Sequence, residues 1–197
     1  ILTKNAAVVD DFDLIEKYRD RVLVGLSITA PPSCAGPVSA LEPNASSISE
    51  RTAALTEAHR RGIRTYGMFC PLLPGISDSK AQIDWLIEFG VRTGVEEIFV
   101  EPVNSRGSGL IHCAEKLRQA GLPAFADKID AVRDRERWSG YVTELLANVQ
   151  ESVRRQHDIQ RLRFLLYPSR LTPTDCERIR RADAGVVWLD KDAAPES

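Results

Sequence analysis

The chain has 197 residues, of which 43% are hydrophobic and 27% charged, an ordinary globular composition. Its net charge of −2 excludes an overall basic field that would attract nucleic acid or an anionic membrane. No apolar run approaches the roughly 20 residues that a membrane span needs, and no signal-peptide pattern opens the chain. We therefore predict a single domain over residues 1–197, located in the cytoplasm and without a membrane partner.

The first half of the chain alternates short apolar runs with helical patterns. Residues 1–4 form a short β-type run, and residues 11–20 are predicted as a helix. The apolar run at 22–29 is typical of a strand that is buried on both faces. Gly, Pro and Ser dominate residues 30–40, which we predict as a loop.

Helix boundaries are marked most clearly in the middle of the chain. Ser47 and Glu50 have the spacing of a capping box, and Gly62 provides a stop for the helix that follows. A second helix is expected to begin at Ser77 or Asp78. The strands expected after these two helices are residues 64–70 and 96–101.

The rest of the chain continues the alternation. A helical stretch is predicted at 109–157, with a break near 121–123, and a strand at 161–167. The next helix has Thr172 as its N-cap and Pro173 as its first residue. The last predicted strand is at 186–189, and a polar tail follows it.

Strands that alternate with helices predict parallel pairing through right-handed crossovers. We predict an α/β fold, a partial parallel (β/α) barrel of TIM-like type that lacks its first strands. The alternative is an open, doubly wound sheet. In both architectures the functional residues gather at the carboxyl ends of the strands, which selects the candidates below.

Three candidates end the first two predicted strands. Lys4 can present its ammonium to a carboxylate or phosphate, can form a Schiff base as in barrel aldolases, or is simply a solvated lysine. Ser27 and Thr29 point to the same side of their strand, where they either bind a ligand together or satisfy backbone groups.

Further polar candidates follow later elements. Glu42 precedes a helix and can accept bonds from its first backbone N–H groups. Glu101 ends an apolar strand, and Asn104 and Arg106 follow it around a Gly-containing turn. We interpret Thr29, Glu42, Glu101, Asn104 and Arg106 as a candidate substrate or cofactor face; the alternative for the last three is a loop that hydrogen-bonds to itself.

The four cysteines lie far apart in the sequence and form no C-x-x-C motif; they are Cys34, Cys70, Cys113 and Cys176. We predict reduced thiols and no metal site within the chain. Cys34 and Cys70 are near the carboxyl ends of strands, although a lone cysteine is more often a small buried hydrophobic residue than a nucleophile or ligand.

Several motifs occur in the order found in one enzyme family. They are ILTK at 1–4, VLVGLSIT at 22–29, LEPNA at 41–45, Arg51 and PLLPGISD at 71–78. Together they resemble the spore photoproduct lyase-like (DNA repair photolyase-like) branch of the radical S-adenosylmethionine enzymes. The resemblance covers most of residues 1–107 and extends less specifically to the final strands.

The resemblance implies a partial (β/α) barrel that, in the intact parent protein, encloses S-adenosylmethionine and a [4Fe–4S] cluster. The parent would cleave the cofactor to a 5′-deoxyadenosyl radical and act as a lyase-like enzyme, with a nucleic-acid lesion as a candidate substrate. By the family pattern, Lys4 and Ser27 contact the methionine or ribose part of the cofactor. The backbone of Met68, Phe69 and Cys70 approaches its adenine.

The chain departs from the family pattern near its start. The C-x₃-C-x₂-C motif that holds the cluster and the acidic glycine-rich segment that follows it have no counterpart here. If Ile1 begins the family's third strand, both features precede it, so we expect about a quarter of the core to be missing. The family's hydrogen-donor cysteine belongs to that part, so neither Cys34 nor Cys70 is assigned its role.

We accordingly expect this chain alone to bind neither cofactor nor cluster and to be inactive. Two further hypotheses stay open. One is a non-redox barrel lyase or aldolase that uses Lys4 with Glu101, and the other is a binding domain without catalytic activity. The sequence does not indicate the oligomeric state.

Overall fold

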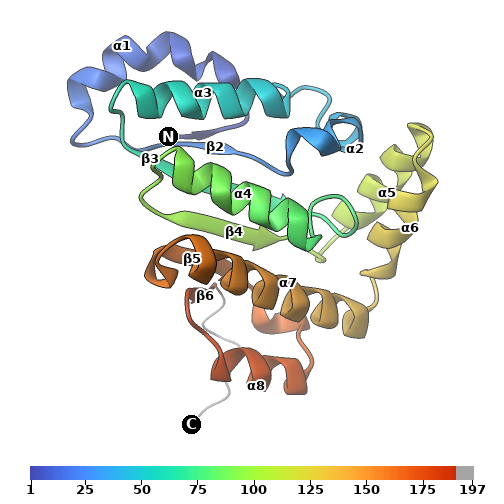
Figure 1. Cartoon of the computed structure of the whole chain (residues 1–197). Helices are drawn as coiled ribbons and strands as arrows, with labels where there is room; N and C mark the ends of the chain where they lie inside the picture. The colour runs from blue at the N-terminus through green and yellow to red at the C-terminus, as the bar shows by residue number, and fades with distance from the viewer. Residues whose placement is uncertain (190–197) are drawn as a thin grey trace.

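The computed structural model of the chain describes residues 1–189, which form one six-stranded parallel sheet with helices between its strands (Figure 1). The strands are β1 (Leu2–Thr3), β2 (Val24–Ser27), β3 (Thr65–Leu72), β4 (Ile98–Pro102), β5 (Leu162–Leu166) and β6 (Val186–Trp188). All six predicted strands are present, with ends that differ from the prediction by a few residues. The polar tail predicted beyond residue 189 lies outside the described residues.

Each strand pairs in parallel with the strand that follows it in the sequence, in the order β1-β2-β3-β4-β5-β6. A doubly wound sheet reverses its strand order at a switch point, so the doubly wound part of the alternative is wrong, whereas the described sheet is open. The α/β class is confirmed. Within residues 1–189, β1 and β6 each pair with one neighbour, so the described sheet has two edges.

The connections contain α1 (Phe12–Ile15), α2 (Ala35–Leu41), α3 (Ile48–Arg60), α4 (Lys80–Arg92), α5 (Gly109–Gln119), α6 (Pro123–Ala131), α7 (Arg135–Gln156) and α8 (Pro173–Arg181). Short 3₁₀ helices are η1 (Ala6–Asp11), η2 (Glu16–Tyr18), η3 (Pro32–Cys34), η4 (Ile159–Arg161) and η5 (Pro168–Arg170). Figure 1 shows α3, α4 and α7 lying alongside the strands.

The two faces of the sheet differ in burial. In β3, Thr65 and Phe69 are buried, whereas the alternating Tyr66 and Met68 are only half-buried. The same alternation recurs in β4 and β5. Right-handed crossovers between sequential strands place their helices on one face, which explains this pattern. The other face stays partly accessible, and the side chains on it can meet a ligand at the carboxyl ends of the strands.

The predicted helix signals are confirmed at several boundaries. Ser47 and Glu50 form a reciprocal capping box at the start of α3, and Gly62 adopts a φ of 70° just after this helix. Thr172 caps α8 by accepting a hydrogen bond from the Asp175 backbone N–H. These local signals depend on neighbouring residues alone, which is why they could be identified without the fold.

The prediction that Ser77 or Asp78 caps α4 is wrong, because both side chains close the preceding turn. Ser77 Oγ accepts a hydrogen bond from Leu73 N at 2.8 Å, and Asp78 Oδ1 accepts one from Gly75 N at 2.8 Å. Ser79 caps the helix instead, in a capping box with Gln82. The PLLPGISD motif therefore builds a turn that directs the chain from β3 into α4.

The loop predicted at residues 30–40 is also wrong, since η3 and α2 occupy most of it. Pro37 lies in the first turn of α2, where its missing N–H breaks no intrahelical bond. The predicted helix at 11–20 is shorter and runs into 3₁₀ turns. The stretch 109–157 has a second break before Asp134, whose side chain caps α7.

Candidate functional site

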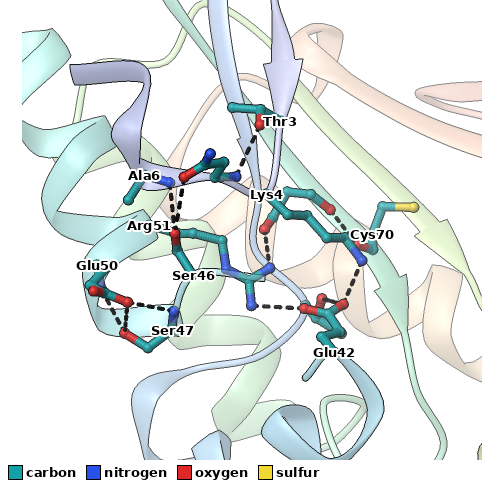
Figure 2. Close-up of polar contacts among 12 residues, drawn as sticks. Thr3, Lys4, Ala6, Glu42, Ser46, Ser47, Glu50, Arg51 and Cys70 are labelled. Carbon is teal, nitrogen blue, oxygen red and sulfur yellow. Dashed lines mark hydrogen bonds and ion pairs between the residues drawn. The ribbon is translucent and has the colours of Figure 1, made fainter. Parts of the chain in front are cut away.

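Lys4 and Glu42 meet beyond the carboxyl ends of β1 and β2. Lys4 Nζ lies 2.5 Å from Glu42 Oε1 (Figure 2). The Lys4 side chain is 39% exposed and the Glu42 side chain 12%, so the ammonium reaches solvent while the carboxylate lies below it. The expectation that Glu42 binds backbone N–H groups at a helix start is not met, because side-chain donors occupy its carboxylate.

Arg51 holds Glu42 from the opposite side. Arg51 Nη2 lies 2.8 Å from Glu42 Oε2, and Arg51 Nη1 donates a hydrogen bond to the Ser27 carbonyl at 2.7 Å. The Arg51 side chain is 1% exposed. A guanidinium taken out of water needs a carboxylate partner, which Glu42 provides. Arg51 thereby fixes the position of Glu42 relative to the end of β2.

The two hydroxyl residues of the β2 end have different partners. Thr29 Oγ1 donates a hydrogen bond to Glu42 Oε1 at 2.9 Å, whereas Ser27 Oγ donates to the Cys70 carbonyl at 2.7 Å. Thr29 thus belongs to the ion-pair cluster, and Ser27 ties β2 to β3. We call Lys4, Thr29, Glu42 and Arg51 the Glu42 cluster.

Glu42 is ionised in this setting. Burial by itself raises the pKa of its carboxyl, but the hydrogen bond and charge of Lys4, the charge of Arg51 and the Thr29 hydroxyl outweigh it. The pKa of Glu42 is therefore lowered from its ordinary value of 4.5. At neutral pH the cluster holds a carboxylate between two cations.

Cys70 and Glu101 form a second contact on neighbouring strands. Cys70 Sγ donates to Glu101 Oε2 at 3.0 Å. Burial, followed by the hydrogen bond and the negative charge of Glu101, raises the pKa of the Cys70 thiol well above its ordinary value. The group is a protonated thiol and not a thiolate nucleophile.

The three β3 residues assigned to the adenine side do not face the same way. Met68 and Cys70 are half-buried on the more accessible face of the sheet, whereas the Phe69 side chain is fully buried. Phe69 can contribute its backbone to such a contact but not its ring. The buried Phe69 ring cannot stack on a ligand at the accessible face of the sheet.

The exposed side of the Lys4–Glu42 pair opens onto a polar hollow. Its other lining residues are Thr3, Asn5, Pro43, Asn44, Ala45 and Ser46. An ammonium has three N–H donors, and the contact with Glu42 uses one of them. Lys4 can therefore donate to a further anionic group from the hollow without leaving Glu42.

The predicted cluster of Glu101, Asn104 and Arg106 divides into separate contacts. Asn104 Oδ1 accepts a hydrogen bond from Arg106 N at 2.9 Å, as in a loop that bonds to itself. The Arg106 guanidinium carbon lies 4.1 Å from the centre of the Tyr167 ring, beyond the end of β5. Glu101, in contrast, belongs with Cys70.

Sequence reasoning did not select three residues of this edge. Arg51 lies on the same helical face as Ile48 and Leu55, a spacing that places a charge in an apolar stripe and could have indicated its burial. Ser105 and Arg170 line a cavity between the ends of β4 and β5. Arg170 follows a predicted strand, and Lys4 ends one. The rule that functional residues gather at strand ends could therefore have selected Arg170 as it selected Lys4.

Within residues 1–189, His, Cys, Asp and Glu side chains form no group of three or more that could hold a metal ion. In the same part of the chain, every helix is too short or too polar to cross a membrane.

Comparison with known protein families, with curated proteins and with solved structures found no match for this chain. Its function is therefore argued from the residues and their geometry.

Proposed function

We propose that this chain is the cofactor-positioning part of a radical S-adenosylmethionine enzyme of the spore photoproduct lyase-like branch. In this proposal the sheet is part of a (β/α) barrel, and the face that helices leave accessible is the inside of that barrel. The intact parent would act on a nucleic-acid lesion.

One observation carries the proposal: motif residues that are far apart in the sequence are neighbours in space. Lys4 from ILTK, Glu42 from LEPNA and Arg51 form one connected cluster, and Ser27 from VLVGLSIT binds both Arg51 and Cys70 (Figure 2). All lie at the carboxyl ends of consecutive parallel strands, where α/β proteins bind their ligands.

The chemistry of the hollow fits the methionine part of the cofactor. Lys4 donates an N–H to the methionyl carboxylate, and Glu42 keeps the ammonium in place from below. Arg51 and Thr29 hold Glu42 in place, and Glu42 in turn holds Lys4. The Lys4 side chain therefore loses little conformational entropy when the ligand binds. When bound and reduced by one electron, S-adenosylmethionine would release methionine and supply a 5′-deoxyadenosyl radical able to remove a hydrogen atom from the substrate.

The described residues do not fit an iron–sulfur cluster. Three clustered cysteines are required, and residues 1–189 contain no such group. The proposal therefore assigns the cluster ligands to sequence that precedes Ile1 in a longer parent protein, and no step is assigned to the cluster here.

The geometry argues against the aldolase hypothesis. A Schiff base requires the Lys4 nitrogen to attack a carbonyl as a free amine, but this nitrogen is engaged by the Glu42 carboxylate. Glu101, the expected partner, is hydrogen-bonded to Cys70 instead. A binding domain without catalytic activity remains the hypothesis that the experiment below must exclude.

The test uses the parent protein, reconstituted anaerobically with iron and sulfide. We expect the electron paramagnetic resonance signal of a reduced [4Fe–4S] cluster, and the formation of methionine and 5′-deoxyadenosine after reduction. Lys4→Met should weaken binding of S-adenosylmethionine about tenfold, because one charge-assisted hydrogen bond is lost.

The matched control is Lys80→Met, which removes a lysine that forms a surface ion pair with Glu151 on the helices. It should change the affinity for S-adenosylmethionine less than twofold. A parent sequence without three clustered cysteines, or equal affinity in the Lys4 and Lys80 variants, would refute the proposal.

A further inference from the structure

A narrow cavity lies between the segment that follows β4 and the turn that follows β5. Ser105, Arg106, Trp138, Tyr167 and Arg170 are among its lining residues. We call it the β4–β5 cavity. It is at the same edge of the sheet as the Glu42 cluster, but its lining residues are different ones.

Ser105 places an unused hydroxyl in this cavity. The residue is 8% exposed, and its Oγ is buried without a hydrogen-bond partner. A buried hydroxyl without a partner costs free energy, which a ligand or an ordered water can recover. The hydroxyl is therefore available to donate to an acceptor that enters the cavity.

Arg170 brings a charge to the same place. Its Nη2 donates a hydrogen bond to the Arg133 carbonyl at 2.9 Å, and its Nε is buried without a partner. Among residues 1–189, no carboxylate forms an ion pair with Arg170. The Arg133 carbonyl holds the guanidinium in position but does not neutralise it.

Arg51, whose side chain is 1% exposed, is more deeply buried than the half-buried Arg170 and differs from it in its partners. Its Nε also lacks a partner, but its charge is balanced by Glu42 at 2.8 Å. A water molecule could satisfy the Ser105 hydroxyl and the Arg170 N–H, but it would not pair with the charge of the half-buried Arg170 guanidinium. An anion satisfies the two donors and the charge together.

We propose that the β4–β5 cavity is a phosphate-binding site, in which Ser105 Oγ and Arg170 Nε donate hydrogen bonds to the same phosphate group. Arginine and hydroxyl donors are the usual partners of phosphate oxygens in proteins. Because the cavity is narrow, one phosphate oxygen enters it, and the remainder of the ligand lies outside.

Arg106 lies at this opening, with its guanidinium over the Tyr167 ring. The site does not depend on this side chain as a donor. The phosphate belongs either to a small phosphate ester or to the backbone of a nucleic acid. The inference goes beyond the proposed radical enzyme and does not require its cofactor, so either can fail without the other.

The experiment titrates the chain with inorganic phosphate, thymidine 5′-monophosphate and a short oligothymidylate, and follows the amide resonances around residues 103–106 by nuclear magnetic resonance. We expect saturable binding of phosphate. Arg170→Gln should raise the dissociation constant about tenfold, and Ser105→Ala by a smaller factor, because the charged donor contributes more than the hydroxyl.

Arg154→Gln is the matched control, because Arg154 is an exposed arginine of α7 and its loss changes the net charge equally. It should change the dissociation constant less than twofold. Tighter binding of the mononucleotide indicates a small phosphate ester, and tighter binding of the oligonucleotide a nucleic-acid backbone. Both results support the site if the Arg170→Gln variant no longer binds one of these two ligands more tightly than the other.

Three results would overturn the proposal. The first is that phosphate does not bind saturably at tens of millimolar, as expected if the cavity holds a buried water only. The second is an equal loss of phosphate affinity in the Arg170→Gln and Arg154→Gln variants. The third is an unchanged phosphate affinity in Ser105→Ala. The last variant keeps the test decisive even if Arg170→Gln does not fold, because it removes only a hydroxyl that has no partner in the protein.

Discussion

The two polar regions at the carboxyl edge of the sheet each contain an arginine, but Arg51 is buried and Arg170 only half-buried, and their partners differ. At the ends of β1 and β2, Arg51 faces Glu42, which also binds Lys4 and Thr29. At the ends of β4 and β5, Arg170 has a backbone carbonyl as partner and, within residues 1–189, no carboxylate. In the first region the buried arginine has a carboxylate partner within the protein, whereas in the second, as we propose, the donors serve a ligand from outside it.

This difference separates positioning from binding. A group whose partners are all internal is held in place, and its removal should affect folding first. A group without an internal counter-charge contributes little to the fold and becomes useful when a ligand arrives. Substitutions at the two sites should therefore affect different measurements, and the following predictions test this separation.

Glu42→Gln should produce the largest loss of stability. It leaves the guanidinium of Arg51, which is 1% exposed, without its counter-charge. We expect the free energy of unfolding to fall by about 3 to 5 kcal/mol, as measured by denaturant titration. Glu88→Gln is the control, because Glu88 forms only an exposed pair with Arg92 at 4.0 Å and should cost less than about 0.5 kcal/mol.

Arg51→Met should cost less, about 1 to 3 kcal/mol, because Glu42 keeps Lys4 and Thr29 as partners. The double variant Glu42→Gln, Arg51→Met should be more stable than the sum of the two single losses predicts, since it leaves no buried charge unpaired. Strict additivity would show that the two side chains do not stabilise each other.

The contribution of the Glu42 cluster to stability should also be lost in acid. The pKa of Glu42 in the folded chain is lowered from the ordinary 4.5, so its ionised form stabilises the fold. This contribution is complete above pH 4.5 and is lost as the pH falls through the lower pKa of the folded state. The stability difference between the wild type and Glu42→Gln should shrink below pH 4.5; a difference that is constant with pH would contradict the assignment.

The substitutions at the β4–β5 cavity should have the smallest effect on folding. Without phosphate, Ser105→Ala should change the free energy of unfolding by less than about 0.5 kcal/mol, because the hydroxyl has no partner to lose. Addition of phosphate should stabilise the wild type more than this variant. Equal stabilisation of the two in thermal unfolding would show that the hydroxyl does not take part in binding.

The sequence predicted the fold well where the signals are local. The strand at 22–29 was identified by its apolar run, and the helix after Ser47 by its capping box. Ser77 and Asp78 failed as caps because their side chains bind Leu73 and Gly75 in a turn, and the sequence pattern does not distinguish these two uses. The same ambiguity made residues 30–40 resemble a loop although α2 occupies part of them.

The candidate site was predicted only in part, because pairing depends on the fold. Lys4 and Thr29 were selected from predicted strand ends and Glu42 from its place before a helix, and the structure brings the three together. It does not bring Glu101 and Arg106 into one cluster, since the first bonds to Cys70 and the second stacks on Tyr167. Side-chain direction and burial decide which polar residues at the strand ends face each other. Both depend on the packing of the whole fold.

The separation of the two regions is tested most directly by the Nε–H resonances of arginine during a titration with inorganic phosphate. Within residues 1–189, neither Arg51 Nε nor Arg170 Nε has a hydrogen-bond partner, but Arg51 has a counter-charge in Glu42. We predict a saturable shift of the Arg170 resonance and no shift of the Arg51 resonance. Shifts of equal size at both, or no saturation at Arg170, would contradict the account.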